Sequence, residues 1–320
     1  MGESGGILNG PEIDRCHRHS GKVRESYVFE NGVRAILVTD RVSAFDHVLG
    51  AIPGKGAILN AIATDWFNRL GDLDIPTHFL HQPHPNVTYN RNADVVPIEF
   101  VVRGYLTGST TTSSWHAYQH HSRMISGVEM PAGMKKNEKF KENILTPSTK
   151  AVDGHDENIS PVEIIERGIM PQALFDQAAE MVMKVFALGQ EVASRHGMIL
   201  VDTKYELGLL SDGTLLFVDE VHTPDSSRYW IAESYERRLA NGEAPESLDK
   251  EFVRQMVIDN GYDPKSDASP VPYLTDGIKE AAIGKYQALS RKFGLQPNAS
   301  RDDVPDLRDA LDGARSYTIS

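Results

Sequence analysis

Cysteine is nearly absent from this 320-residue sequence, in which Cys16 is the single thiol. One thiol cannot form a disulfide within the chain, so we expect the fold to rest on its core and the protein to work in a reducing compartment, the cytoplasm. Long apolar runs are also lacking. No stretch approaches the ~18 apolar residues that a membrane-spanning helix needs, so no membrane partner is predicted.

Positive charge is in deficit. The chain has 33 Lys and Arg against 45 Asp and Glu, a formal net charge of -12. Binding to nucleic acid depends on clustered basic residues that neutralise phosphates, so the balance argues against a nucleic-acid partner. Small anionic ligands stay open, because they need only a local group of basic side chains.

Several catalytic signatures are missing as well. The sequence contains neither the G-x-x-x-x-G-K-[ST] loop nor the G-x-G-x-x-G fingerprint, and no Ser-His-Asp or Cys-His arrangement is apparent. His78, His81 and His84 lie among prolines and glutamine without cysteine partners, which favours loop histidines over metal ligands.

The patterns that are present predict a mixed α+β fold. Alternation over residues 21–40 with Asn31-Gly32 in the middle indicates a β-hairpin. A β-branched run at 95–102 indicates a strand, placed near an edge because it contains Pro97. Further strands are expected at 198–207 and 215–221, and helices at 58–70, 161–167, 173–195, 249–260, 276–293 and 304–314. Hairpins first and helices later favour α+β over a regular βαβ sheet.

The same patterns divide the chain. Residues 1–19 start Gly-rich and polar, without the apolar core of a signal peptide, and are interpreted as a disordered lead-in. Residues 20–105 are expected to form a small β-rich domain, and residues 106–320 a larger α+β domain that ends in the C-terminal helices.

The strand pair joined at Asp212-Gly213 carries the clearest chemical pattern. Alternation places Asp202, Lys204 and Glu206 on one face of the first strand. If Asp212 and Gly213 alone form the loop, Glu206 lies directly opposite Asp219. Two opposed carboxylates repel unless a cation joins them, and Mg²⁺ prefers such oxygen ligands. The alternative is a solvated, merely charged sheet face, and a loop of odd length would break the register.

Three further segments have the character of anion sites. Arg228 follows a turn and hydroxyl residues and could hold a phosphate or carboxylate, or simply contact Asp225 nearby. Arg103 precedes two glycines and Ser109 at the start of an expected helix, a pattern that is equally typical of an ordinary turn. Lys22 and Arg24 share a face beside Ser20 and Gly21 and could contact nucleotide phosphates.

These segments, in this order, resemble the SAICAR synthetase family over about residues 20–254. The resemblance is carried by residues 20–24, 39–46, 52–56, 101–109, 146–151, 154–158, 202–206 and 219–228. Thr39 departs mildly from the serine that is more usual in the family. Nothing after residue 254 aligns with a motif, so the oligomeric state and the role of the C-terminal helices stay open.

The resemblance implies an ATP- and Mg²⁺-dependent ligase of purine biosynthesis. Such an enzyme joins L-aspartate to the carboxylated aminoimidazole ribonucleotide CAIR and releases SAICAR, ADP and phosphate. It implies a fold similar to that of ATP-grasp enzymes and protein kinases, with an ATP cleft between a small and a larger part. A kinase and a catalytically silent nucleotide-binding protein remain as rival readings, although the kinase H-R-D-x-x-x-x-N spacing is missing.

Carried over residue by residue, the resemblance assigns the following roles. For ATP it implies Ser20, Gly21, Lys22, Arg24, Lys150, Glu206 and Asp219. The metal would be held by Glu206 and Asp219. For CAIR it implies Arg103, Ser109, Asp202, Lys204 and Arg228, with Lys204 and Asp202 at the reactive end. For aspartate it implies Ser43, Asp46 and Lys55.

Overall fold

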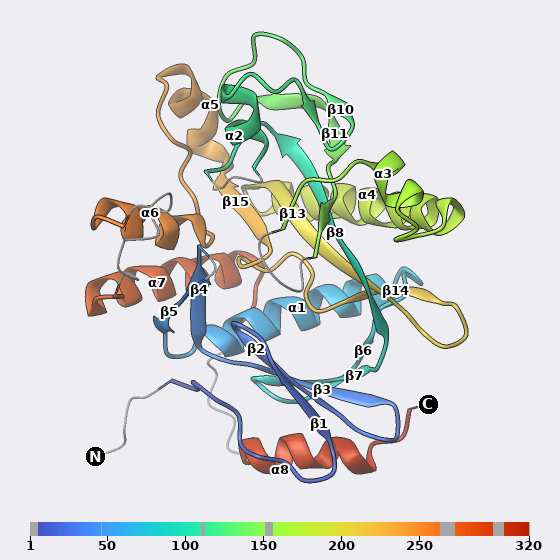
Figure 1. Ribbon diagram of the computed structural model, residues 1–320. Coiled ribbons are helices and arrows are strands. Elements are labelled where there is room, and N and C mark those ends of the chain that lie inside the picture. Colours follow the sequence, from blue (N-terminus) through green and yellow to red (C-terminus); the bar gives the residue numbers. More distant parts are fainter. Residues whose placement is uncertain are drawn as a thin grey trace. The chain divides into compact units, whose positions relative to one another are not determined.

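A computed structural model describes residues 6–45, 47–109, 113–150, 156–262, 273–296 and 304–319 (Figure 1). The chain forms two compact units. The first takes Met1–Ala93, Thr223–Asp225 and Leu248–Ser320, and the second takes Asp94–His222 and Ser226–Ser247. This division differs from the predicted one: the predicted boundary at 105 is the last residue of a strand that belongs wholly to the second unit, and the C-terminal helices belong to the first unit.

The first unit is built on an antiparallel sheet in the order β1-β2-β3-β7-β6, with β4 and β5 as a separate pair. Its elements are β1 (His17–Ser20), β2 (Arg24–Val28), β3 (Val33–Val38), β4 (Arg41–Ala44), β5 (His47–Ala51), α1 (Lys55–Gly71), β6 (Phe79–His84), β7 (Val87–Arg91), α6 (Glu251–Asp259), α7 (Asp276–Lys292), α8 (Leu307–Asp312) and the 3₁₀ turn η1 (Gly313–Ser316).

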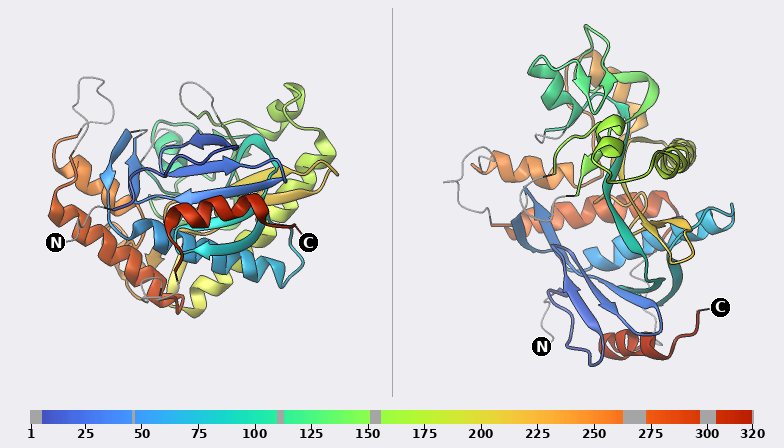
Figure 2. Two further views of the ribbon diagram at one scale, coloured as in Figure 1. Left: turned by 90° about the horizontal axis from the view of Figure 1, so that it is seen from below. Right: turned by 45° about the vertical axis from the view of Figure 1, so that its right-hand side comes forward.

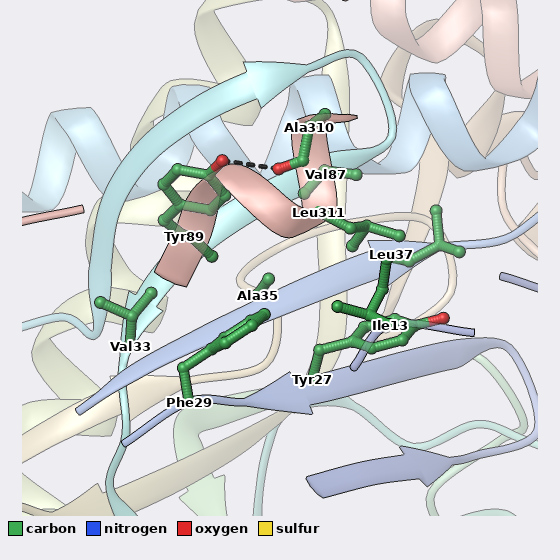
Figure 3. Close-up of a cluster of buried hydrophobic side chains, with 11 residues drawn as sticks. Ile13, Tyr27, Phe29, Val33, Ala35, Leu37, Val87, Tyr89, Ala310 and Leu311 are labelled. Carbon is green, nitrogen blue, oxygen red and sulfur yellow. Dashed lines mark hydrogen bonds between the residues drawn. The ribbon is translucent and has the colours of Figure 1, made fainter. Parts of the chain in front are cut away.

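Both faces of this sheet are buried, and β3 shows why. Its side chains alternate between the two faces. Ile36 and Val38 form a cluster with Leu59 of α1, whereas Ala35 and Leu37 belong to the cluster that contains Leu311 of α8. Figure 3 shows α8 seated on that second face, where Tyr89 Oη donates a 2.5 Å hydrogen bond to the carbonyl of Ala310. The C-terminal helix α8 is therefore part of the core of the first unit.

The predicted hairpin is confirmed, and its turn contacts the C-terminal segment. Val33 pairs with Phe29, and Gly32 in the intervening loop has a φ of 80°. The Asn31 side-chain amide donates to the carbonyls of Ala314 and Tyr317 at 2.9 and 3.0 Å.

Two local predictions for the first unit were wrong. Residues 1–19 were expected to be a disordered lead-in, but this stretch contains β1 and a segment in which the Ile7 N–H donates to Asp40. Residues 1–5 lie outside the described part of the chain. Two of the supposed loop histidines, His81 and His84, lie in β6, whereas His78 directly precedes that strand. His78 packs edge-on against Phe67, and His81 stacks on Tyr317.

The second unit contains a sheet in the order β11-β8-β13-β14, in which β15 also pairs with β13 and β12 with β8. Its elements are β8 (Asp94–Tyr105), α2 (Ser114–Gln119), β9 (Met124–Ile125), β10 (Val128–Glu129), β11 (Lys139–Leu145), β12 (Ser148–Thr149), α3 (Pro161–Glu166), α4 (Gln172–Arg195), β13 (Met198–Leu209), β14 (Leu215–Val218), β15 (Ser227–Ile231) and α5 (Ala232–Ala240).

The strand that contains Pro97 was predicted near an edge, and this was wrong. β8 lies between β11 and β13. Proline lacks an N–H and is tolerated inside a sheet only where the ladder is interrupted. The ladder between β8 and β13 is irregular between Glu206 and Gly208, where the partners change from Glu99 to Val95. Pro97 therefore lies at a bulge and not at an edge.

The long helix α4 covers one face of these strands (Figure 2). Its buried positions Ala178, Val182 and Val185 follow helical spacing. Phe175 near its start packs on Phe100 of β8, with ring centroids 6.1 Å apart. The opposite face of β8 and β13 carries the charged residues described next.

Candidate functional site

The charged face of β13 holds the predicted residues of the second unit. Asp202, Lys204 and Glu206 lie two residues apart, and the Nζ of Lys204 lies 3.6 Å from a Glu206 carboxylate oxygen. The prediction that these side chains share a face is confirmed. At Asp202 the strand is flanked by β8 and β15, which contribute Arg103 and Arg228 at the opposing positions.

One end of this face is an arginine pair built around Asp202. Arg228 donates to Asp202 Oδ2 at 2.6 Å, and an Arg103 nitrogen lies 3.7 Å from the same oxygen. Arg103 also donates to Thr146 Oγ1 at 2.7 Å. In these contacts two guanidinium groups share one carboxylate, so the three side chains together carry one net positive charge. The hydrogen bond to Asp202 gives Arg228 a carboxylate partner on the neighbouring strand.

Burial changes the pKa of Arg103, one member of this arginine pair. Arg103 is 5% exposed. Burial lowers the pKa of Arg103 to about 10, Asp202 raises it in part, and the nearby Arg228 lowers it further. A buried cation of this kind gains from an anion that supplies a second counter-charge.

The loop after β8 lies against Arg228. Gly108 has a φ of 107°. A Cβ placed on Gly108 would lie 2.3 Å from the Cβ of Ser113 and 3.4 Å from an Arg228 nitrogen. The loop therefore requires glycine here, and Ser109 follows directly as an exposed hydroxyl. Arg103 and Arg228 lie together at this end of the face, and the loop brings Gly108, the residue before Ser109, next to Arg228.

The other end of the face is a cluster of alternating charges. Lys204 contacts Glu99 as well as Glu206, and Lys150 contacts Glu206. Burial by itself would lower the pKa of Lys204, but Glu99, Glu206 and Asp219 outweigh it and raise that pKa above the usual lysine range. Lys204 is therefore a fixed cation. Burial raises the pKa of Glu99, although Lys204 opposes this.

The predicted register between the two strands was wrong by one residue. Glu206 pairs with Val218 and Leu209 with Leu215, so Asp219 is not opposite Glu206. The loop has three residues, since Leu210 N–H donates to Thr214 at 3.0 Å and Gly213 has a φ of 87°. A three-residue hairpin loop with glycine in the left-handed conformation is the common alternative to a two-residue loop. The carboxylate opposite Glu206 is Glu99, on the other neighbouring strand.

Asp219 nevertheless belongs to the surroundings of Lys204. It lies beyond the end of β14, in the left-handed conformation with a φ of 63°, and its charge contributes to the raised pKa of Lys204. The bend at Asp219, and not strand pairing, brings this carboxylate to the cluster.

The reverse face of β13 anchors the segment after Asp219. Tyr205 hydrogen-bonds His222 Nε2, and Tyr229 Oη donates to the His222 carbonyl at 2.7 Å. His222 has a φ of 54° and is fully buried. A Cβ on Gly189 of α4 would lie 2.3 Å from the imidazole. The neighbours of Lys204 and Arg228 are thus fixed through one buried histidine.

The predicted nucleotide contacts Ser20, Gly21, Lys22 and Arg24 lie in the first unit, at the turn between β1 and β2. Ser20 pairs with Glu25, and Gly21 N–H donates to the Arg24 carbonyl at 2.8 Å. This turn is short and ordered by hydrogen bonds to its carbonyls, which are described below.

Two of the three residues predicted for aspartate are described, and both belong to a buried ionic cluster of the first unit. Lys55 is fully buried, with its Nζ 2.8 Å from Asp225 Oδ2. Lys250 lies 3.6 Å from the same oxygen and 3.5 Å from Ser43 Oγ. Burial would raise the pKa of Asp225, but Lys250 and Lys55 outweigh it and lower that pKa well below the usual range. Asp46 lies outside the described residues.

Sequence reasoning missed two acidic residues of these clusters. Glu99 is the one charged residue in the run from Val95 to Val102, and a charge inside a buried strand is itself a signal of a partner. Asp225 was considered only as a contact of Arg228. Nothing local in the sequence indicates that Lys55, 170 positions earlier, is its partner.

The carboxylates near Lys204 fit a hard divalent cation only in part. Among the described residues, no three of His, Cys, Asp or Glu are grouped closely enough to hold a metal ion. Mg²⁺, however, commonly takes one or two carboxylates and completes its shell with phosphate oxygens and water. Glu206 and Asp219 fit such a set as oxygen donors. In the part of the chain that the structure describes, no helix is long and apolar enough to cross a membrane.

Comparison with known proteins identifies the family. The model of the SAICAR synthetase family matches residues 17–269. A putative phosphoribosylaminoimidazole-succinocarboxamide synthase 2 of Mesorhizobium japonicum is 45% identical over 301 residues, which cover 92% of this chain and 94% of the relative. The chloroplastic phosphoribosylaminoimidazole-succinocarboxamide synthase of Vigna aconitifolia is 50% identical over 235 residues, 73% of this chain and 68% of the relative.

A solved structure gives the same result for the fold. SAICAR synthase from Saccharomyces cerevisiae, complexed with SAICAR, matches with a TM-score of 0.74 and 27% identity, over 98% of this chain and 99% of that chain. The expected α+β fold is confirmed. With a family match over residues 17–269 and relatives at 45 to 50% identity, this chain belongs to the SAICAR synthetase family.

Proposed function

We propose that this protein joins L-aspartate to CAIR at the expense of ATP, giving SAICAR, ADP and phosphate in purine biosynthesis. The observation that carries the proposal is the charged face of β13. It has an arginine pair at Asp202 and a lysine-carboxylate cluster at Glu206, in a chain of the SAICAR synthetase family.

The two ends of the face suit the two ends of CAIR. Four residues of strand separate Asp202 from Glu206, roughly 13 Å at 3.3 Å per residue. We assign the CAIR phosphate to Arg103, Arg228 and Ser109, where positive charge is in excess. The reactive carboxylate would then approach Lys204. Asp202, which the resemblance places with Lys204 at the reactive end, is assigned instead to holding the arginines in place.

The chemistry requires charge neutralisation more than a protein nucleophile. A carboxylate oxygen of CAIR attacks the γ-phosphorus of ATP, the bond to the β-phosphate oxygen breaks, and ADP leaves. The aspartate amine then attacks the acyl phosphate carbon, phosphate leaves with the transferred oxygen, and the amine releases a proton. Lys204, a fixed cation by its raised pKa, offsets the negative charge on the phosphoryl oxygens.

For the nucleotide, each unit supplies its own candidates. In the second unit these are Lys150 and the carboxylates Glu206 and Asp219, which would hold Mg²⁺ together with phosphate oxygens. Mg²⁺ when bound neutralises phosphate charge and orients the γ-phosphoryl group. In the first unit the candidates are Ser20, Gly21, Lys22 and Arg24.

The aspartate assignment to Ser43, Asp46 and Lys55 stays a prediction. The ion pair between Lys55 and Asp225 makes Lys55 the weakest of the three, because a fully buried ammonium group already has its counter-ion. Ser43, whose Oγ lies 3.5 Å from Lys250, is better suited to contact a carboxylate. We expect the reaction to take place in the cytoplasm.

The test is a turnover assay with purified protein, ATP and Mg²⁺, in which CAIR and L-aspartate are supplied together and singly. We expect ADP and SAICAR in equal amounts only when both are present. ADP release that needs neither substrate, or transfer of phosphate to a hydroxyl group of CAIR, would favour the kinase alternative. Nucleotide binding without any release would favour a catalytically silent protein.

A further inference from the structure

The segment Thr39-Asp40-Arg41 is part of the pattern that resembles the family, yet none of its three residues is assigned to ATP, CAIR, aspartate or the metal ion. All three are buried in the first unit, at 0%, 3% and 8% exposure. Buried polar groups are normally retained with specific partners, so these partners indicate what the segment does.

Two of the three residues hold the turn between β1 and β2 by its carbonyl groups. Arg41 donates from Nη2 to the Gly21 carbonyl at 2.9 Å and from Nε to the Lys22 carbonyl at 3.0 Å. Thr39 donates to the Val23 carbonyl from both its N–H, at 3.1 Å, and its Oγ1, at 2.7 Å. Three consecutive carbonyls of the turn are therefore directed at residues 39–41.

This arrangement sets the direction of the N–H groups. In a planar trans peptide unit the carbonyl and the N–H of the next residue point in opposite directions. With the carbonyls of Gly21 and Lys22 directed at Arg41, the N–H groups of Lys22 and Val23 face away from it. Successive N–H groups that point to one side of a turn form a site for an anion.

The remaining contacts keep Arg41 in place. Its Nη1 donates to Glu25 Oε1 at 2.9 Å, and Glu25 is also held by Arg18 at 2.8 Å and by the Gly10 N–H at 3.1 Å. Burial alone would raise the pKa of Glu25, but the hydrogen bonds from Arg41 and Arg18 outweigh it and lower that pKa. Arg41 therefore stays paired with an ionised carboxylate at neutral pH.

Asp40 fixes the other side of the segment. Its Oδ1 accepts from the Gly56 N–H at 2.8 Å, in the first turn of α1, and its Oδ2 accepts from the Ile7 N–H at 2.9 Å. A Cβ on Gly56 would lie 2.3 Å from the Val38 carbonyl. The segment is thus rigidly joined to α1, so the turn is held by a fixed support.

We propose that Arg41 is a positioning residue for the nucleotide: its guanidinium group draws the carbonyls of Gly21 and Lys22 inward and so presents the N–H groups of Lys22 and Val23, with the Lys22 side chain, to the phosphates of ATP. This inference rests on the proposed function, because it requires the turn of β1 and β2 to contact nucleotide. It assigns Thr39 a supporting part through the Val23 carbonyl.

The experiment compares Arg41→Lys with Arg18→Lys. Both replace an arginine on Glu25 by lysine, which keeps the charge and loses the fork. The guanidinium group of Arg18, however, donates to Glu25, Glu12 and the Gly10 carbonyl, whereas that of Arg41 donates to the turn. Titration with Mg·ADP should show binding weakened about tenfold or more in Arg41→Lys and changed less than about twofold in Arg18→Lys. KM for ATP should follow, while KM for CAIR and for aspartate stays within about twofold.

A second pair covers the case in which Arg41→Lys fails to fold. Thr39→Ser keeps the hydroxyl and should bind Mg·ADP like the parent chain. Thr39→Val keeps the N–H but loses the hydroxyl bond to the Val23 carbonyl and should bind Mg·ADP more weakly. Equal Mg·ADP binding in both members of each folded pair would overturn the inference. The two proposals can fail separately. If the parent chain makes no SAICAR, but Mg·ADP binding differs among the variants as expected, the proposed function is overturned and the inference stands.

Discussion

Glu99 and Glu206 occupy directly opposed positions on β8 and β13, and the ammonium group of Lys204 contacts both carboxylates. Opposed carboxylates repel each other, so this pair destabilises the fold. The ammonium group of Lys204 offsets the repulsion as long as it lies between the two carboxylates. A protein keeps such an arrangement where the charges are needed for chemistry, which makes the cluster the first object of mutation.

Replacing either proposed metal ligand should abolish turnover without unfolding the protein. In Glu206→Gln and Asp219→Asn the shape is kept and a charged oxygen ligand is lost, so we expect kcat to fall at least about 100-fold at saturating Mg²⁺. Steady-state rates and melting temperatures measure the two effects. Glu191→Gln, on the exposed face of α4, is the matched control, and near-parent rates in Glu206→Gln would refute the metal assignment.

Changing Arg228 to lysine should weaken CAIR binding selectively. Lysine keeps the charge but cannot donate two parallel hydrogen bonds to Asp202 and a phosphate. We expect KM for CAIR to rise about tenfold or more, with KM for ATP within about twofold. Arg195→Lys, in an exposed ion pair with Glu191, should change neither constant. Equal increases for CAIR and ATP would show that Arg228 does not act on CAIR.

Stability should fall on acidification because of His222. Burial lowers the pKa of His222 to about 3, below the ordinary value near 6.5. Between these two pH values the unfolded chain binds a proton that the folded chain does not, so stability is lost as the pH falls through that window. From pH 7 to pH 5 this amounts to about 2 kcal/mol.

Urea unfolding of the parent chain and of His222→Asn at both pH values isolates this contribution. Asparagine tolerates the positive φ of position 222 and does not titrate. The loss of stability between pH 7 and pH 5 should be smaller in the variant by about 2 kcal/mol. An identical loss in both proteins would mean that His222 is not held neutral by the fold.

The C-terminal helix should be required for the stability of the first unit. Leu311 is fully buried in the cluster that contains Tyr27 and Leu37 (Figure 3). Leu311→Ala should lower the free energy of unfolding by about 2 to 5 kcal/mol, whereas Arg308→Ala, at an exposed position of the same helix, should change it by less than about 0.5 kcal/mol. Chemical denaturation measures both, and equal effects would place α8 outside the core.

What the sequence predicted well is local. The shared face of Asp202, Lys204 and Glu206 depends only on the two-residue period of a strand, and the extent of α4 depends on the spacing of its apolar residues. Neither requires knowledge of which segment lies next to which. The fold class followed from the order of such elements.

The features that the sequence predicted poorly depend on whether a loop has one residue more or less, or on partners that are distant in the sequence. An Asp212-Gly213 pair fits a two-residue loop and a three-residue loop equally well, and the difference moved every partner of β14 by one position. Pro97 indicated an edge because the bulge that accommodates it forms with β13, more than a hundred residues later. The position of α8 on the sheet depends on the hydrogen bond from Tyr89 to the Ala310 carbonyl, which joins residues 221 positions apart.

The central claim is that the CAIR carboxylate is activated by phosphoryl transfer, and isotope transfer tests it most directly. CAIR labelled with ¹⁸O in its carboxylate is turned over with ATP, Mg²⁺ and L-aspartate, and the inorganic phosphate is analysed by mass spectrometry. The account predicts one ¹⁸O atom in each phosphate formed together with SAICAR. Phosphate that carries no label while SAICAR accumulates would contradict it, because the oxygen lost from the carboxylate would then have left by another route.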